Sequence, residues 1–250
     1  MTPNLILKVL STLSSRNVRY LLMGGQACVL YGGAEFSRDT DIVVLADANN
    51  LNQLQIALAD LQAECIAVPP LSRDYLLRGH AVHFRCWHPD AARMRVDVMA
   101  VMREVEPFEN LWARRMTLEH SSGVDIEVLS LPDLVAAKKT QRDKDWPMIR
   151  RLIEADFQTH QASPTIEQVN FWLTQSRTPS MLLELALRYS LELQQHLVRR
   201  PLLAAAAAGD EQALREALDD EERRERDADR AYWQPLRAEL EELRRQRPRN

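Results

Sequence analysis

The 250-residue chain has few cysteines and no long apolar segment. Its three cysteines, Cys28, Cys65 and Cys86, are widely scattered, which argues against a disulfide framework and favours a reducing compartment such as the cytoplasm. No run approaches the roughly 18 apolar residues that a transmembrane helix needs, so we expect no membrane partner. The amino-terminal apolar stretch is short and has no small-residue cleavage site after it, so it predicts an amphipathic helix and not a signal peptide.

Lysine is also rare, since only four of the 32 basic residues are lysines. The net charge of -4 excludes a protein that coats nucleic acid through a uniformly basic surface, but it allows a local basic site. Three of the four lysines, Lys138, Lys139 and Lys144, fall within seven residues and mark one such region. The rest of the composition, 46% hydrophobic and 27% charged, is ordinary for a soluble globular protein.

Hydrophobic patterning divides the chain into a mixed part and a helical part. Up to about residue 130, helical periodicity alternates with short apolar runs that are typical of strands. Beyond about residue 160 no strand pattern remains. We therefore predict an α+β fold in which helices flank a mixed β-sheet, with one domain over residues 1–158 and an all-helical region over 159–250. The expected helices cover about 4–15, 26–31 and 50–61, and the expected strands cover about 20–23, 40–45, 80–87, 94–99 and 124–129.

Two glycines and three aspartates form the most informative pattern in the sequence. Gly24 and Gly25 follow an apolar strand and open a short helix, a place where the backbone can approach a ligand closely. Asp39 and Asp41 lie two residues apart at the start of the next strand, so both carboxylates project from one face. Asp97 is a lone acid within an apolar strand, where an uncompensated charge is costly. A divalent cation is the usual solution for such neighbouring carboxylates, so the sequence predicts a Mg²⁺ or Mn²⁺ site.

This pattern resembles the nucleotidyltransferase-fold superfamily, to which DNA polymerase β belongs. Within it, the sequence looks most like the small bacterial nucleotidyltransferases of the AbiEii toxin-like group. The resemblance covers about residues 5–155 and leaves the later helices unidentified. It is carried by Gly24-Gly25-Gln26-Ala27, by Arg38-Asp39-Thr40-Asp41, by Asp97 in the later strand, and by Lys139, Arg142 and Asp145.

The resemblance implies a phosphorus-group transfer enzyme. It would move a nucleoside monophosphate from a nucleoside triphosphate such as ATP to an RNA, for example a tRNA end, or to a protein side chain. An antitoxin protein is an implied partner, because toxin–antitoxin pairs are one setting of the group. The aspartates would hold two metal ions and act as the catalytic residues, while the nucleotide would contact Gly24, Gly25, Gln26, Arg38, Lys139 and Arg142.

Several alternatives stay open at this stage. Aligning the aspartate pair of relatives with Asp41-Ile42-Val43 would put valine at the second acidic position and weaken the metal site. The domain would then be a degenerate module that binds nucleotide, RNA or a protein. Lys139 and Arg142, three residues apart, are expected to share a helix face, which is either a phosphate contact or an ordinary solvated face. A zinc site at His80, His83, Cys86 and His88 is disfavoured, because the spacing matches no closed tetrahedral pattern.

Overall fold

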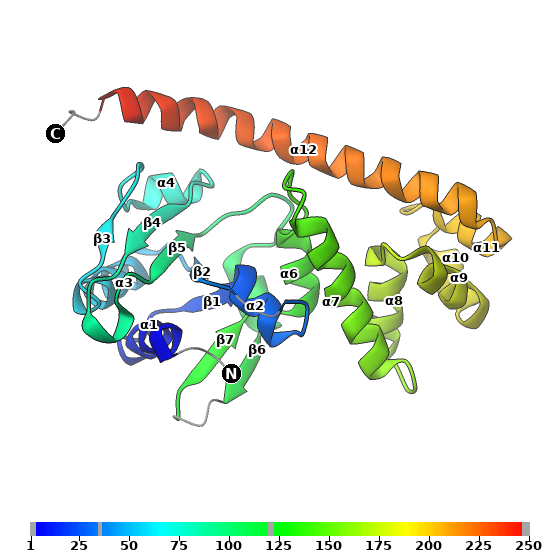
Figure 1. The fold of residues 1–250 in the computed structure, drawn as a ribbon, viewed down its shortest axis with the longest axis horizontal. Coiled ribbons are helices and arrows are strands. Elements are labelled where there is room, and N and C mark those ends of the chain that lie inside the picture. The colour runs from blue at the N-terminus through cyan, green and yellow to red at the C-terminus, as the bar shows by residue number, and fades with distance from the viewer. Residues whose placement is uncertain (1–3, 35–36, 120–122, 247–250) are drawn as a thin grey trace. The chain divides into compact units, whose positions relative to one another are not determined.

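The computed structural model describes residues 4–34, 37–119 and 123–246. Helices and strands alternate in its first part (Figure 1). The strands are β1 (Tyr20–Met23), β2 (Asp39–Val44), β3 (Glu64–Cys65), β4 (Val82–Arg85), β5 (Arg95–Met99), β6 (Met116–Glu119) and β7 (Asp125–Val128). The helices are α1 (Asn4–Ser15), α2 (Gly24–Leu30), α3 (Ala48–Asp60), α4 (Arg73–Leu77), α5 (Phe108–Ala113), α6 (Leu131–Ala137), α7 (Asp145–His160), α8 (Ile166–Gln175), α9 (Pro179–Arg188), α10 (Ser190–His196), α11 (Leu203–Ala208) and α12 (Glu211–Gln246), and a 3-10 turn covers Pro89–Ala91.

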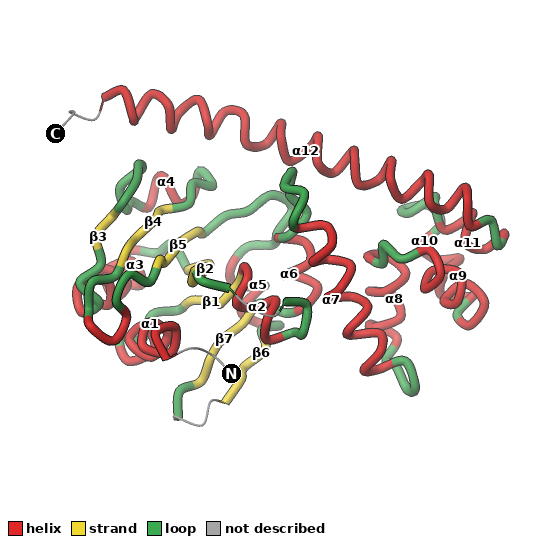
Figure 2. Tube along the Cα trace, viewed as in Figure 1, coloured by secondary structure: helices red, strands yellow, loops and turns green. Residues whose placement is uncertain are grey.

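The seven strands form one mixed sheet in the order β3-β4-β5-β2-β1-β7-β6 (Figure 2). The pairs β1–β7 and β2–β5 are parallel, and the other neighbouring pairs are antiparallel. In the described residues after β7, all regular structure is helical. The predicted α+β class with a C-terminal helical region is confirmed. Every helix of the described chain is too short or too polar to pass through a bilayer.

The core forms around β1, whose four residues are all buried. This strand lies between β2 and β7, so its backbone is paired with a neighbouring strand on each edge. Helix α1 buries Ile6, Val9, Leu10 and Leu13, which recur at helical spacing along one face. These two elements have the predicted bounds, because a continuous buried run and a clean 3.6-residue period are the strongest signals a sequence gives.

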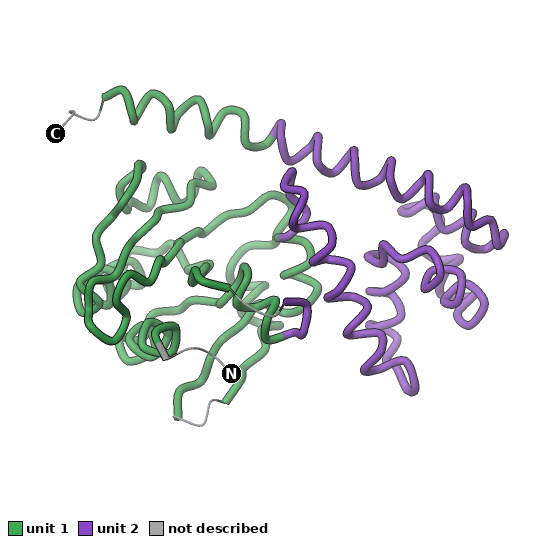
Figure 3. The backbone as a smooth tube through the Cα atoms, viewed as in Figure 1, with its two compact units in different colours: residues 1–30, 35–137, 232–250 green, residues 31–34, 138–231 purple. Residues whose placement is uncertain are grey.

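The chain forms two compact units, and each contains segments that are distant in the sequence (Figure 3). Unit 1 comprises residues 1–30, 35–137 and 232–250, and it contains the sheet. Unit 2 comprises residues 31–34 and 138–231, and it is helical. The division into domains at residue 158 remains a proposal.

The last part of α12 belongs to unit 1 and contacts the segment before β4. Glu239 binds the buried His80 through Nε2 at 2.6 Å and Arg78 through Nη1 at 2.6 Å. A Cβ built on Gly79 would lie 2.3 Å from the hydroxyl of Tyr232, so the helix packs directly on this backbone. Leu236, on the same part of α12, is buried.

Candidate active site

Pairing of β2 with β5 brings the three predicted aspartates together in unit 1. Asp39 and Asp41 alternate along β2 with Thr40 and Ile42, which are fully buried, so both carboxylates lie on the other, half-open face. In the parallel register Asp41 is directly opposite Asp97 of β5. Paired residues of neighbouring strands point to the same side of a sheet, so the three carboxylates form a row on one face.

The two glycines lie directly beside this row. Met23, the last residue of β1, is paired with Asp41, and Gly24 follows with a φ of +68°, which only glycine adopts readily. Gly25 N donates a long hydrogen bond of 3.4 Å to Asp41 Oδ2. The glycine pair therefore lets the chain turn into α2 while the carboxylate of Asp41 lies against its backbone.

Gln26 and Arg38 flank the same turn. Gln26 is buried, and its Nε2 donates to Ser37 O at 2.6 Å, which ties α2 to the segment that enters β2. Arg38 is exposed immediately before β2. The contact gives Gln26 a structural role, and nucleotide binding by Gln26 and Arg38 remains a prediction.

Asp97 is bound by Arg95 and His83, two residues that the sequence analysis does not identify as part of the site. Its Oδ1 lies 2.7 Å from Arg95 Nε and 2.9 Å from His83 Nδ1, and His83 is opposite Asp97 in the β4–β5 register. Burial alone would raise the pKa of Asp97, but the hydrogen bonds from His83 and Arg95 outweigh it and lower the pKa. The carboxylate is therefore ionised at neutral pH. The spacing Arg95-x-Asp97, which puts both side chains on one strand face, was the available signal.

Arg95 also faces the other two acids. Its hydrogen bond to Asp97 raises the pKa of Arg95 in spite of partial burial, and the charges of Asp97, Asp39 and Asp41 raise it further. Asp39 is directly opposite Arg95 in the β2–β5 register. The guanidinium thus lies beside the whole row of carboxylates.

The chemistry of the three aspartates fits a hard divalent cation such as Mg²⁺, which prefers carboxylate oxygens. Their register gives them a common face. Across residues 4–34, 37–119 and 123–246, however, no three His, Cys, Asp or Glu side chains converge into a ready metal-binding group. In this arrangement Asp97 Oδ1 is engaged by protein donors.

Lys139 and Arg142 belong to unit 2, and the expectation that they share a helix face is wrong. Residues 138–144 form the connection between α6 and α7, not a helix. The chain turns here because Asp145, which is buried, draws three groups toward it: Lys138 Nζ at 3.3 Å, Arg142 Nε at 2.7 Å and Thr140 Oγ1 at 2.5 Å. This part of the motif therefore forms an ionic cluster around the buried Asp145, and Arg142 is its exposed member.

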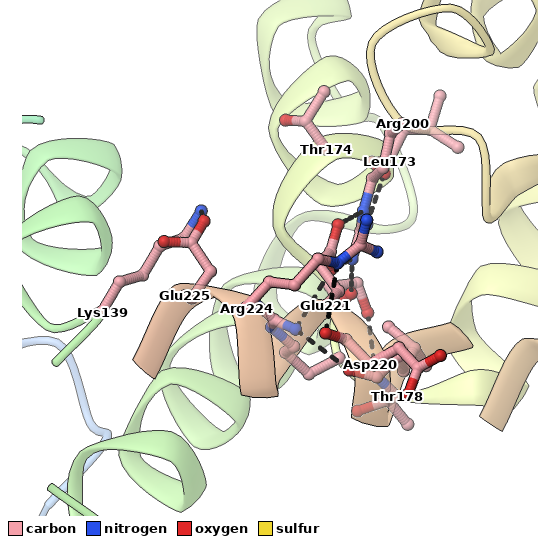
Figure 4. Close-up of polar contacts among 12 residues, drawn as sticks. Lys139, Leu173, Thr174, Thr178, Arg200, Asp220, Glu221, Arg224 and Glu225 are labelled. Carbon is pink, nitrogen blue, oxygen red and sulfur yellow. Dashed lines mark hydrogen bonds and ion pairs between the residues drawn. The ribbon is translucent and has the colours of Figure 1, made fainter. Parts of the chain in front are cut away.

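Lys139 points to a second group of charges within unit 2 (Figure 4). Its Nζ lies 3.6 Å from Glu225 of α12, and burial lowers the pKa of Lys139 although Glu225 opposes that shift. In the same group Arg200 pairs with Glu221 at 2.8 Å and donates to the carbonyls of Leu173 and Ser176, each at 2.7 Å. These contacts join the connections before α7 and after α10 to the glutamates of α12. Phosphate binding by Lys139 and Arg142 remains a prediction.

The histidines and cysteine of the disfavoured zinc pattern make separate local contacts. His80 binds Glu239, and His83 binds Asp97. His88 Nδ1 accepts a hydrogen bond from Asp90 N at 3.1 Å. Cys86 is fully buried.

No protein-family model and no curated protein matches the chain. Among solved structures, the chain is similar to the solution structure of the antibiotic-resistance factor ANT(2'')-Ia, with 14% identity, a TM-score of 0.33, and coverage of 87% of this chain and 90% of that one. It is also similar to the crystal structure of ANT(2")-Ia in complex with adenylyl-2"-tobramycin, with 12% identity, a TM-score of 0.34, and coverage of 87% and 96%. At these TM-scores neither likeness carries an argument about function. The functional proposal therefore rests on the row of aspartates, the glycine turn and the motif that contains them.

Proposed function

We propose that the protein is a metal-dependent nucleotidyltransferase, which transfers a nucleoside monophosphate from a nucleoside triphosphate to an acceptor. The observation that carries the proposal is the placement of Asp41 directly opposite Asp97, with Asp39 on the same face and the Gly24–Gly25 turn beside them. Its sequence support is the resemblance to the nucleotidyltransferase superfamily.

In this proposal Asp39, Asp41 and Asp97 are the catalytic residues and hold Mg²⁺ or Mn²⁺. When bound, the ions would supply positive charge to the triphosphate and would lower the pKa of the attacking hydroxyl. The backbone of Gly24, Gly25 and Gln26 lies at the start of α2, where N–H groups favour phosphate. In the structure, Gly25 N–H donates to Asp41 Oδ2. Arg38, immediately before β2, would offset charge that develops during the transfer. Lys139 and Arg142 belong to unit 2, and their contact with nucleotide phosphates is a proposal that rests on the family resemblance alone.

The acceptor in this proposal is an RNA, such as a tRNA end, or a protein side chain. Toxin–antitoxin biology in the cytoplasm, with an antitoxin as protein partner, is the setting that the resemblance implies. Both points rest on the family resemblance alone.

The test is a transfer assay with each NTP labelled at the α-phosphate. The protein is incubated with Mg²⁺ or Mn²⁺ and, in separate reactions, total RNA, a protein extract or an aminoglycoside. We expect label to move to one acceptor class and to stay on NTP when Asp41→Asn replaces the natural chain. Absence of labelled product under all of these conditions would contradict the proposal.

A second candidate is a degenerate module that binds nucleotide, RNA or a protein without catalysis. It is favoured by the engagement of Asp97 Oδ1 with Arg95 and His83. Calorimetry with a non-hydrolysable NTP separates the two candidates. The enzyme should bind the NTP more tightly with Mg²⁺ than with a chelator, whereas the module should show the same affinity in both.

A further inference from the structure

Arg95 is built into the sheet where the proposed metal site lies. It is two residues before Asp97 in β5, so both side chains project from the same face. The Nε–Oδ1 distance is 2.7 Å, and the strand register places Arg95 opposite Asp39. One guanidinium is thus adjacent to two of the three proposed metal ligands.

His83 completes the contact from the neighbouring strand. Its Nδ1 lies 2.9 Å from Asp97 Oδ1 and 3.1 Å from Arg95 Nη2. One ring nitrogen can either donate to the carboxylate or accept from the guanidinium, but it cannot do both. Arg95 therefore has two alternative acceptors within reach, and only one of them is a proposed metal ligand.

The electrostatic consequence follows from the charges on this face. Three carboxylates in a row repel one another, and a positive charge between them relieves that repulsion. The Arg95 side chain is 37% exposed, so it can move into solvent, whereas that of Asp97 is only 15% exposed and is fixed by its strand. A divalent cation that binds Asp97 through Oδ1 needs the oxygen that Arg95 and His83 contact, and it has twice the charge of the guanidinium.

We propose that Arg95, supported by His83, is an internal counter-ion that offsets part of the negative charge of the aspartate row when no divalent cation is bound. Arg95 and the metal compete for Asp97, so metal binding displaces the guanidinium from the carboxylate. This inference rests on the proposed function, because it takes the three aspartates to be the metal ligands.

The experiment measures Mn²⁺ binding to the full chain by calorimetry and by the paramagnetic resonance signal of free Mn²⁺. Arg95→Gln should bind Mn²⁺ about fivefold more tightly than the natural chain, because the competing charge is removed. Arg95→Lys should bind within about twofold of the natural chain, since it keeps the charge. Arg115→Gln is the matched control, because Arg115 also pairs with a carboxylate in unit 1, Glu127 at 2.7 Å, away from the aspartate row.

Tighter binding by Arg95→Gln, together with unchanged binding by Arg115→Gln, supports the inference. Weaker or unchanged binding by Arg95→Gln overturns it, and in that case Mn²⁺ binding that Asp41→Asn abolishes leaves the proposed metal site intact. If neither the natural chain nor Arg95→Gln binds Mn²⁺, with or without NTP, the proposed function fails together with the inference. Circular dichroism melts confirm that each variant is folded.

Discussion

Asp41 and Gly24 occupy one small volume at the end of β1. A Cβ at position 24 would lie 1.8 Å from Asp41 Oδ2, far inside van der Waals contact. The positive φ of Gly24 has a local cause as well, because it turns the chain from β1 into α2. The glycine is therefore required by the carboxylate row itself, whatever ligand the row binds.

Replacement of Gly24 by alanine should destabilise the protein by about 3 kcal/mol or more, since the methyl group adds a clash to the cost of a positive φ. The matched control is Gly123→Ala, because Gly123 has a φ of +77° with no atom within 4 Å of the added Cβ. That control should cost about 1 kcal/mol. Urea unfolding measures the loss of unfolding free energy in both variants. Equal losses would show that the Asp41 side chain moves aside at little cost.

The proposed catalytic acids can be separated by amide substitutions. Asp41→Asn and Asp97→Asn should each abolish nucleotidyl transfer, because each removes metal-binding charge without changing size. Asp97→Asn should also lower the unfolding midpoint, because it removes the charge that Arg95 and His83 hold. Asp39→Asn should abolish transfer as well if Asp39 and Asp41 form the metal pair. Full activity of Asp39→Asn would favour the alignment in which Val43, which is buried, occupies the second acidic position.

Cys86 should resist alkylation in the folded protein. Burial raises the pKa of its thiol to about 11, so only about one molecule in a thousand carries the thiolate at pH 8. Cys65 is half-buried and should react first with iodoacetamide. Mass spectrometry of the modified peptides at pH 8, before and after urea, measures the order. Equal rates for the two cysteines in the absence of urea would contradict the expectation.

Asp145 should stabilise unit 2 in a pH-dependent way. Burial raises its pKa, but the charge of Lys138, the hydrogen bond of Thr140 and the charge of Arg142 lower it by more. A carboxyl with a lowered folded pKa stabilises the protein above its unfolded pKa of about 3.9 and loses that effect as the pH falls through the folded value.

Asp145→Asn should therefore cost about 3 kcal/mol at pH 7, and the difference from the natural chain should shrink below about pH 4. Asp143→Asn is the control, because the side chain of Asp143 is 94% exposed and pairs with Arg226 at the surface. Urea midpoints between pH 3 and 7 give both series. A loss that does not change with pH would assign the effect to packing.

The elements that the sequence predicts best are those in which apolar periodicity or continuous burial alone determines the pattern. Helix α1 and strand β1 are set by apolar periodicity and burial, and β2 begins within one residue of its predicted start. The common face of the three aspartates also follows from the two-residue period of strands. The strands β3 and β6 were not predicted, because they are short edge strands of the sheet and carry polar residues at half of their positions.

The roles of Arg95 and Lys138 depend on partners that the sequence does not place beside them. His83 reaches Asp97 only through the β4–β5 register. Lys138 turns inward to Asp145, and this interrupts the helix that the local composition favours between α6 and α7. Such contacts depend on the tertiary structure, so the conformational propensities of neighbouring residues do not predict them.

The contact between Glu239 and His80 makes the last part of α12 a structural component of unit 1. The imidazole of His80 is completely buried, and Nε2 has its 2.6 Å partner on α12. A chain that stopped at residue 231 would leave that ring nitrogen without the carboxylate and would uncover the backbone at Gly79. Truncation that removes this part of α12 therefore acts as a core mutation at a site some 160 residues away in sequence.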